Sequence, residues 1–241
     1  MIDVYWSFNA LGGNSDLIVE KPMNPLVDLK KNNYFVGIEM VNYSKCTSLP
    51  HYFKNVFVVK AISDFTLKRQ LNSDGEYVIT TDKSQEFFDN IFEINTYEKE
   101  QQVIKMSWFW FFFSEKSVDV RGMPAFLHEN DFTKNTTFLP GLMDISKWFR
   151  PIHPAFKMNT SEINVKRGDA LFYLHFNTDE KIKLKHFEMS ESINNYSSGC
   201  LHVKKFADKL SLKRLYELFT KRNYNKKIMK EIKKNLTGDF E

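Results

Sequence analysis

The sequence contains few cysteines, few glycines and prolines, and no long hydrophobic run, and each shortage excludes a class of protein. Two cysteines, Cys46 and Cys200, are too few for a disulfide scaffold in a chain of 241 residues. We therefore expect free thiols and a reducing, cytoplasmic environment. Nine glycines and seven prolines argue against a collagen-like or low-complexity chain.

The sequence also shows no pattern typical of a targeting signal or of a membrane-spanning helix. The first residues show no basic region followed by an apolar run, so we expect no secretory signal. The most apolar stretch, residues 106–113, is far shorter than the roughly 20 residues that a spanning helix needs, so we expect no membrane contact. This stretch instead predicts a central strand that is covered on both faces.

Familiar catalytic and nucleotide-binding motifs are absent as well. The chain holds no phosphate-binding Walker loop, no dinucleotide glycine motif and no nucleophile elbow. A Ser-His-Asp triad leaves no local mark in a sequence, so it stays open. The missing motifs favour a protein that is not an enzyme, without excluding one.

Aromatic residues are abundant, with 23 phenylalanines and an aromatic fraction of 15%. Aromatic side chains suit the pleated, half-buried surface of a sheet, so this composition favours a mainly β fold. Ile2, Val4 and Trp6 alternate with other residues, which predicts a strand at the N-terminus.

Two hairpins are predicted from their turn residues. The first covers residues 65–81, where Asp74 and Gly75 supply the positive φ that a tight turn needs. The second covers residues 161–176, with Gly168 in the turn.

A polar segment, residues 190–199, predicts a loop between two parts of the chain. We expect residues 1–200 to form a β-sandwich or a cupin-like barrel. Residues 201–241 should form a basic, amphipathic appendage of two helices, the first capped by Ser211.

Two apolar stripes with helical spacing occur in this tail: Leu212, Leu215, Tyr216 and Phe219, then Ile228, Ile232 and Leu236. We expect them to pack on the β-rich part or on a second subunit. Between Val203 and Leu236 the net charge is +9, which leaves −5 for the rest of a chain whose total is +4. Such asymmetry is typical of a solvated helical face or of a tail that binds a partner.

One short segment resembles a metal motif. His186 and Glu188 have the His-x-Glu spacing of cupin-like enzymes, in which imidazole and carboxylate ligands hold a metal such as iron. A further histidine must complete that site, and His202 is the only one that follows. His128 and its acidic neighbours also suggest a metal, but their polar surroundings favour exposed charge.

Nucleic-acid binding is a further hypothesis for the tail. It needs cations that neutralise phosphates and, often, an aromatic ring on which a base stacks. The candidate residues are Lys221, Arg222, Tyr224, Lys226 and Lys227.

Six short motifs suggest a family. They lie at residues 46–49 (CTSL), 55–59 (NVFVV), 64–65 (DF), 124–126 (PAF), 144–151 (DISKWFRP) and 163–171 (INVKRGDAL). Together they resemble an uncharacterised family of phage and bacterial proteins, a domain of unknown function common in marine cyanophages, over roughly residues 40–190. The resemblance implies a viral or marine origin and a compact β-rich domain, and it brings no activity or cofactor.

Arg150 lies within one of these motifs, and two interpretations of it stay open. It is either the partner of a buried ion pair or a ligand for an anion. Its neighbours Trp148 and Phe149 are expected in the core.

The leading hypothesis is a non-enzymatic, phage-related accessory or structural protein that binds a partner or associates with itself through the helical stripes. Its place would be the host cytosol or, for a viral gene, the virion. The alternatives are a cupin-like metal-dependent enzyme and a nucleic-acid-binding accessory protein. Cofactor, substrate and oligomeric state do not follow from the sequence.

Overall fold

The computed structural model describes residues 1–8, 20–32, 46–98, 101–107, 110–206 and 209–237. The strands are β1 Ile2–Phe8, β2 Val56–Lys60, β3 Phe65–Leu71, β4 Tyr77–Thr81, β5 Phe92–Glu98, β6 Gln101–Met106, β7 Trp110–Phe113, β8 Asp119–Pro124, β9 Thr136–Leu139, β10 Leu142–Asp144, β11 Ala155–Met158, β12 Glu162–Val165, β13 Ala170–Asn177 and β14 Ile182–His186. The helices are α1 Pro25–Lys31, α3 Ser48–Tyr52, α4 Gln85–Ile91, α5 Asp131–Asn135, α6 Glu191–Phe206, α7 Leu212–Lys221 and α8 Tyr224–Lys234.

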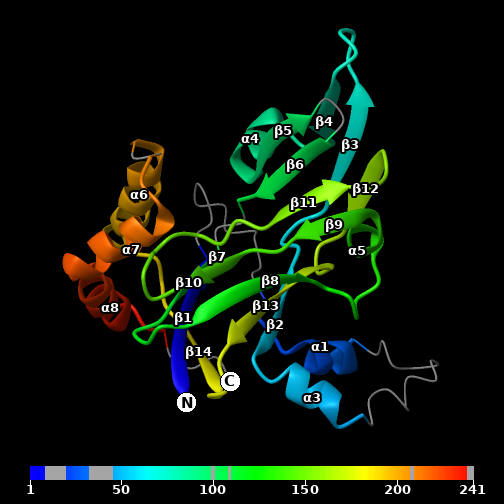
Figure 1. Cartoon of the computed structure of the whole chain (residues 1–241). Coiled ribbons are helices and arrows are strands. Elements are labelled where there is room, and N and C mark those ends of the chain that lie inside the picture. Colours follow the sequence, from blue (N-terminus) through cyan, green and yellow to red (C-terminus); the bar gives the residue numbers. More distant parts are fainter. Residues whose placement is uncertain (9–19, 33–45, 99–100, 108–109, 207–208, 238–241) are drawn as a thin grey trace.

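The fold is mainly β, as the composition predicts, and the strands form four small sheets. Their orders are β14-β1-β7, β10-β8-β13-β2, β5-β6-β11-β9 and β12-β3-β4. Among the described residues none of these sheets closes on itself, so the arrangement is sandwich-like and the cupin-like barrel is not formed. Helices α6, α7 and α8 gather on one side of the strands, and the β3-β4 hairpin projects at the other end (Figure 1).

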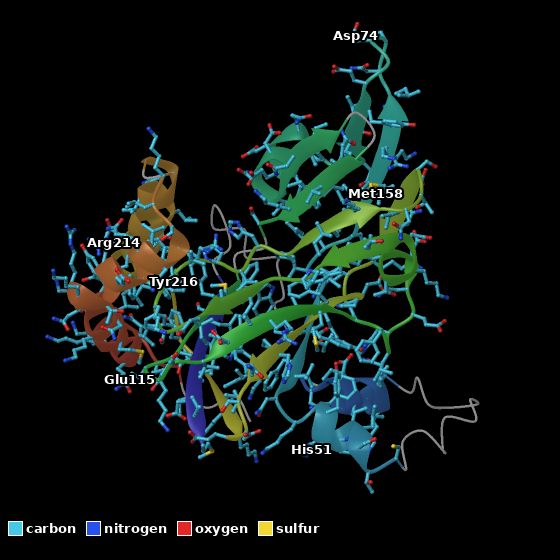
Figure 2. All side chains as sticks on the ribbon, viewed as in Figure 1. His51, Asp74, Glu115, Met158, Arg214 and Tyr216 are labelled. Carbon is cyan, nitrogen blue, oxygen red and sulfur yellow. The ribbon has the colours of Figure 1, made fainter. Side chains whose placement is uncertain are left out.

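The first predicted hairpin is confirmed. Strands β3 and β4 pair antiparallel, and Gly75 has a φ of 73° in the turn between them. The Asn72 side chain accepts hydrogen bonds from the backbone N–H groups of Asp74, at 3.0 Å, and Glu76, at 2.9 Å. Asp74 marks the tip of the hairpin in Figure 2.

The second predicted hairpin is wrong. Gly168 does adopt a left-handed turn, with a φ of 87°, but β12 pairs with β3 whereas β13 pairs with β2 and β8. The turn itself is bound to the β2-β3 connection, because Gly168 N–H donates to Ala61 O at 2.8 Å and Arg167 N–H to Asp64 Oδ1 at 2.6 Å. These contacts direct the two strands into different sheets.

The two predicted helices of the tail are confirmed, and a further helix, α6, precedes them. Helices α7 and α8 match the two apolar stripes, and the Ser211 hydroxyl caps α7 by accepting from Arg214 N–H at 3.3 Å. Helix α6 begins at Glu191, inside the segment predicted as a loop, so the expected division at residue 200 falls within a helix. Its many serines and asparagines have weak helix propensity, and buried Ile193 and Cys200 supply the packing that compensates.

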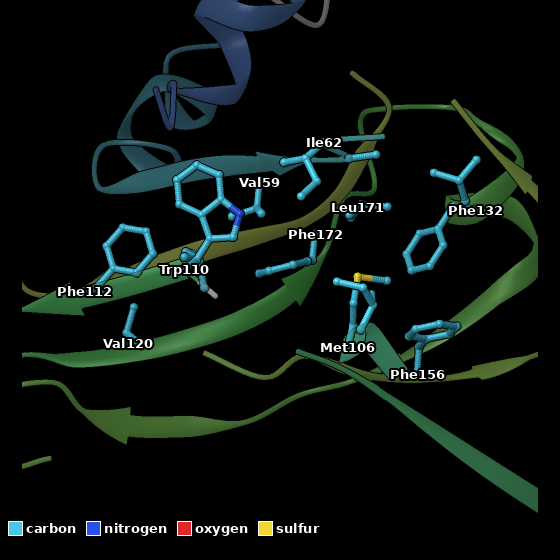
Figure 3. Close-up of a cluster of buried hydrophobic side chains, with 14 of the residues drawn as sticks. Val59, Ile62, Met106, Trp110, Phe112, Val120, Phe132, Phe156, Leu171 and Phe172 are labelled. Carbon is cyan, nitrogen blue, oxygen red and sulfur yellow. The ribbon is translucent and has the colours of Figure 1, made fainter. Parts of the chain in front are cut away.

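Strand β7 is buried on both faces, as predicted, and it separates two hydrophobic clusters. Trp110 and Phe112 belong to the main cluster inside the sandwich, where Figure 3 shows them near Val120. Phe111 and Phe113 point the other way, into a second cluster that contains the tail helices. The strand is not central in its sheet, however, because β1 takes that place.

Four residues of the two apolar stripes are covered by the same chain, whereas Leu212 and Leu236 are exposed. Leu215, Phe219, Ile228 and Ile232 are buried in the second cluster together with Trp148 and other residues of the β-rich part. Packing on the β-rich part, one of the two expectations, is therefore confirmed. The buried stripe residues are not available for self-association. No described helix is both long and apolar enough to cross a bilayer.

Replacing Phe113 tests whether β7 holds the tail helices. Phe113→Ala should lower the free energy of unfolding by about 3–5 kcal/mol, because the ring is fully buried against Phe149 and Phe219. Phe126→Ala is the control and should cost less, since Phe126 is 52% exposed. Urea unfolding followed by circular dichroism measures both. A Phe113→Ala variant within about 1 kcal/mol of the parent would refute the anchoring role.

Candidate functional site

A pocket of about 710 Å³ lies among the three C-terminal helices and the Trp148 segment. Its walls are mainly apolar and aromatic, and they include Trp148, Tyr196, Phe219 and Tyr224. Pockets of roughly 300–1,000 Å³ with such walls are typical of small-molecule sites. This pocket is therefore the leading candidate for a functional site.

Aromatic packing fixes the shape of this helical pocket. The Phe219 ring lies 5.8 Å from Trp148 and 5.7 Å from Tyr224, measured between ring centroids, and Tyr224 lies 6.2 Å from Tyr196. These distances are those of directly interacting aromatic rings. Gly199 of α6 also lines the pocket, and a Cβ atom added there would meet no atom within 4 Å. The absent side chain thus leaves room for a ligand.

Charged groups are few around the helical pocket. Glu191 and Arg222 line it and carry opposite charges, and both are exposed at the surface. The Cys200 thiol lies in the buried part of the wall, where desolvation raises its pKa to about 11. The thiol therefore stays protonated at neutral pH, which makes it a poor nucleophile.

The residues proposed for nucleic-acid binding occupy two environments. The exposed ones are Lys221, Arg222, Lys226 and Lys227. Tyr224 is instead half-buried in the pocket wall, with the Lys227 ammonium 5.3 Å from its ring centroid. The candidate ring is therefore part of the pocket wall, whereas the four basic side chains are exposed.

The structure does not assemble a metal site around His186. Its ring lies 4.6 Å from that of Trp6, and its Nδ1 is 2.7 Å from the Thr237 hydroxyl. Burial lowers the pKa of His186. Glu188 and His202 are exposed, and no three His, Cys, Asp or Glu side chains of the described residues are grouped to hold a metal.

A second cluster of polar groups lies buried under α1. His128, predicted as exposed charge, is only 4% exposed. Its Nε2 is 3.0 Å from Asp28 Oδ2 and its Nδ1 is 2.7 Å from the Tyr173 hydroxyl. The Lys60 ammonium lies 2.6 Å from Asp28 Oδ1. No local pattern in the sequence indicates this network, because its members lie far apart along the chain.

The hydrogen bonds of this buried network are mutually consistent. Because an ionised carboxylate only accepts, the Nε2–H group of His128 donates to Asp28 Oδ2, and Nδ1 accepts from the Tyr173 hydroxyl. Burial raises the pKa of Tyr173, so the phenol keeps its proton. The same oxygen accepts from Leu127 N–H at 3.2 Å. The network thus joins α1 to strands β2 and β13.

Several pocket residues were missed in the sequence. Tyr196 and Cys200 lie in the segment predicted as a loop, and Trp148 was predicted only as a core residue. The spacing of Ile193, Tyr196 and Cys200 at i, i+3 and i+7 is a helical signal that could have revealed α6.

Comparison of the chain with family models, with curated proteins and with solved structures found no match. The resemblance to the phage and bacterial family therefore stays a prediction.

The buried network should make stability depend on pH. Burial opposes ionisation of Asp28, but hydrogen bonds from His128 and Lys60 hold its pKa below the ordinary value. The ionised Asp28 carboxylate and its two partners therefore contribute their full stabilisation above about pH 4. This contribution is lost as the pH falls through the lowered pKa of Asp28. Asp28→Asn should cost about 3–5 kcal/mol at neutral pH, because it leaves Lys60 without its buried partner.

Unfolding by urea at several pH values measures this effect. The stability of Asp28→Asn should fall less steeply below about pH 4 than that of the parent chain. Asp74→Asn, at the exposed hairpin tip, is the matched control and should follow the parent. Parallel pH profiles for Asp28→Asn and the parent would contradict the assignment.

Proposed function

We propose that this protein is a non-enzymatic binding protein that holds a small, neutral, apolar molecule among helices α6, α7 and α8. The observation that carries the proposal is the aromatic pocket of about 710 Å³. A cavity of this size and lining buries most of the surface of a small molecule.

The charges at the pocket support a neutral ligand. Glu191 and Arg222 balance one another among the lining residues, and the Cys200 thiol is uncharged at neutral pH. A charged ligand would lose its hydration on entry without gaining a dedicated counter-charge. A neutral apolar molecule loses little hydration energy and gains contact with the aromatic walls.

The protonated thiol also favours reversible binding over covalent capture. Cys200 is the cysteine in the wall, and its raised pKa keeps the reactive thiolate scarce. The helices around it are fixed to strand β7 through the Phe113–Phe219 contact. A preformed site needs little ordering when the ligand arrives, which favours affinity.

A neutral fluorescent probe tests this function. N-phenyl-1-naphthylamine should bind the full chain in a saturable way, with a rise in probe fluorescence. Gly199→Leu should weaken binding by about tenfold or more, because the new side chain enters space that is empty in the parent. Circular dichroism should show an unchanged fold, since leucine also favours a helix more than glycine does.

His202→Leu is the matched control, because it adds a leucine to an exposed position of the same helix that does not line the pocket. It should bind the probe as the parent does. Equal affinity of Gly199→Leu and the parent, or binding that does not saturate, would refute the proposal.

A further inference from the structure

A second pocket, of about 210 Å³, lies in the β-rich part of the chain. Strands β8, β9, β10 and β13 and the segment from Arg150 to Ala155 line it. Its walls are mainly apolar and include Phe138 and Phe172, whose ring centroids lie 5.6 Å apart in a stacked arrangement, and His153 also lines it. Gly141 and Leu142 line it too and are exposed, so the pocket opens to solvent.

Arg150 gives this pocket a positive charge that its other residues do not balance. No Asp or Glu stands among the described residues that line the pocket. Within the described part of the chain, the Arg150 guanidinium makes no ion pair and no hydrogen bond, and only Tyr216 and Cys200 act on it electrostatically. Asp144, six positions earlier, is already engaged by the Lys147 ammonium at 2.6 Å and by the hydroxyls of Ser117 and Ser146.

The other groups that act electrostatically on Arg150 are uncharged at neutral pH. They are Tyr216 and Cys200, and burial raises the pKa of each. Burial also lowers the pKa of Arg150, although a guanidinium remains protonated in a protein. A partly buried cation with no counter-charge is costly, so it is a favourable place for an anion from solution.

We infer that Arg150 binds the carboxylate of a small organic monoanion whose apolar part fills this second pocket. The planar guanidinium offers two parallel N–H donors, which match the two oxygens of a carboxylate. One arginine balances one negative charge, whereas phosphate carries more charge and needs further donors. The Phe138 and Phe172 walls provide contact for an apolar body that acetate does not have.

Calorimetric titration and thermal unfolding with benzoate, benzamide and acetate test this inference on the full chain. Benzoate should bind in a saturable way and raise the melting temperature, because a ligand of the folded state stabilises it. Benzamide has nearly the same shape without the charge, and acetate has the charge without the ring. In the Gly199→Leu chain, whose helical pocket is filled by the new side chain, both should bind at least about tenfold more weakly than benzoate.

Arg150→Met should abolish the benzoate-dependent rise in melting temperature. Without ligand this variant should be at least as stable as the parent, because it removes a charge that has no partner. Arg167→Met makes the same change in an exposed turn and should respond to benzoate as the parent does. Gly199→Leu should also keep benzoate binding, which separates this pocket from the helical one.

Several results would overturn the inference: no saturable binding of benzoate, equal binding of benzamide and benzoate by Gly199→Leu, or unchanged benzoate binding by Arg150→Met. Inorganic phosphate that binds as tightly as benzoate in an Arg150-dependent way would contradict the assignment to a carboxylate. If Arg150→Met fails to fold, the comparison of benzoate with benzamide on the Gly199→Leu chain still decides the question.

Discussion

The architecture depends on strand β7, because the side chains on both of its faces are buried in hydrophobic clusters. Along β7 the side chains alternate, so Trp110 and Phe112 complete the sandwich while Phe111 and Phe113 provide the floor on which the tail helices pack. A single polar residue in this run would place a polar group without a hydrogen-bond partner in one of the two clusters. The same alternation continues in β1, where Trp6 faces the sandwich and Tyr5 faces the helices. The two clusters are therefore built on a shared wall.

Local patterns were sufficient for the elements whose cause is local. The Asp74–Gly75 turn specifies its own hairpin, and the stripes of α7 and α8 specify two amphipathic helices. Local patterns led to wrong predictions where contacts between residues far apart in the sequence determine the structure. The turn at Gly168 looks like that of a hairpin, but hydrogen bonds to the β2-β3 connection separate its strands. Helix α6 forms from polar residues because its few apolar side chains reach the second cluster.

The candidate sites also include residues that the sequence indicated and residues that it did not. Arg150 was singled out from the sequence, and the structure adds that no described acid pairs with it and that it lines an apolar pocket. Tyr224 was singled out too, but for stacking on a base, whereas its ring forms part of a pocket wall. The Asp28–His128–Tyr173 network had no signal at all, because buried polar partners from separate segments leave no periodic trace.

The pairing of β1 also has a consequence for the order in which the chain can fold. Strand β1 lies between β7 and β14, and Ile2 is paired with Ile182. On a ribosome the first strand must therefore wait until most of the polypeptide has been made before its parallel neighbour exists. Contacts between residues so distant in sequence form slowly. Until they form, the phenylalanine-rich strand β7 stays exposed. The sheet on which the tail helices pack is thus completed late, and nascent chains would depend on protection from aggregation until then.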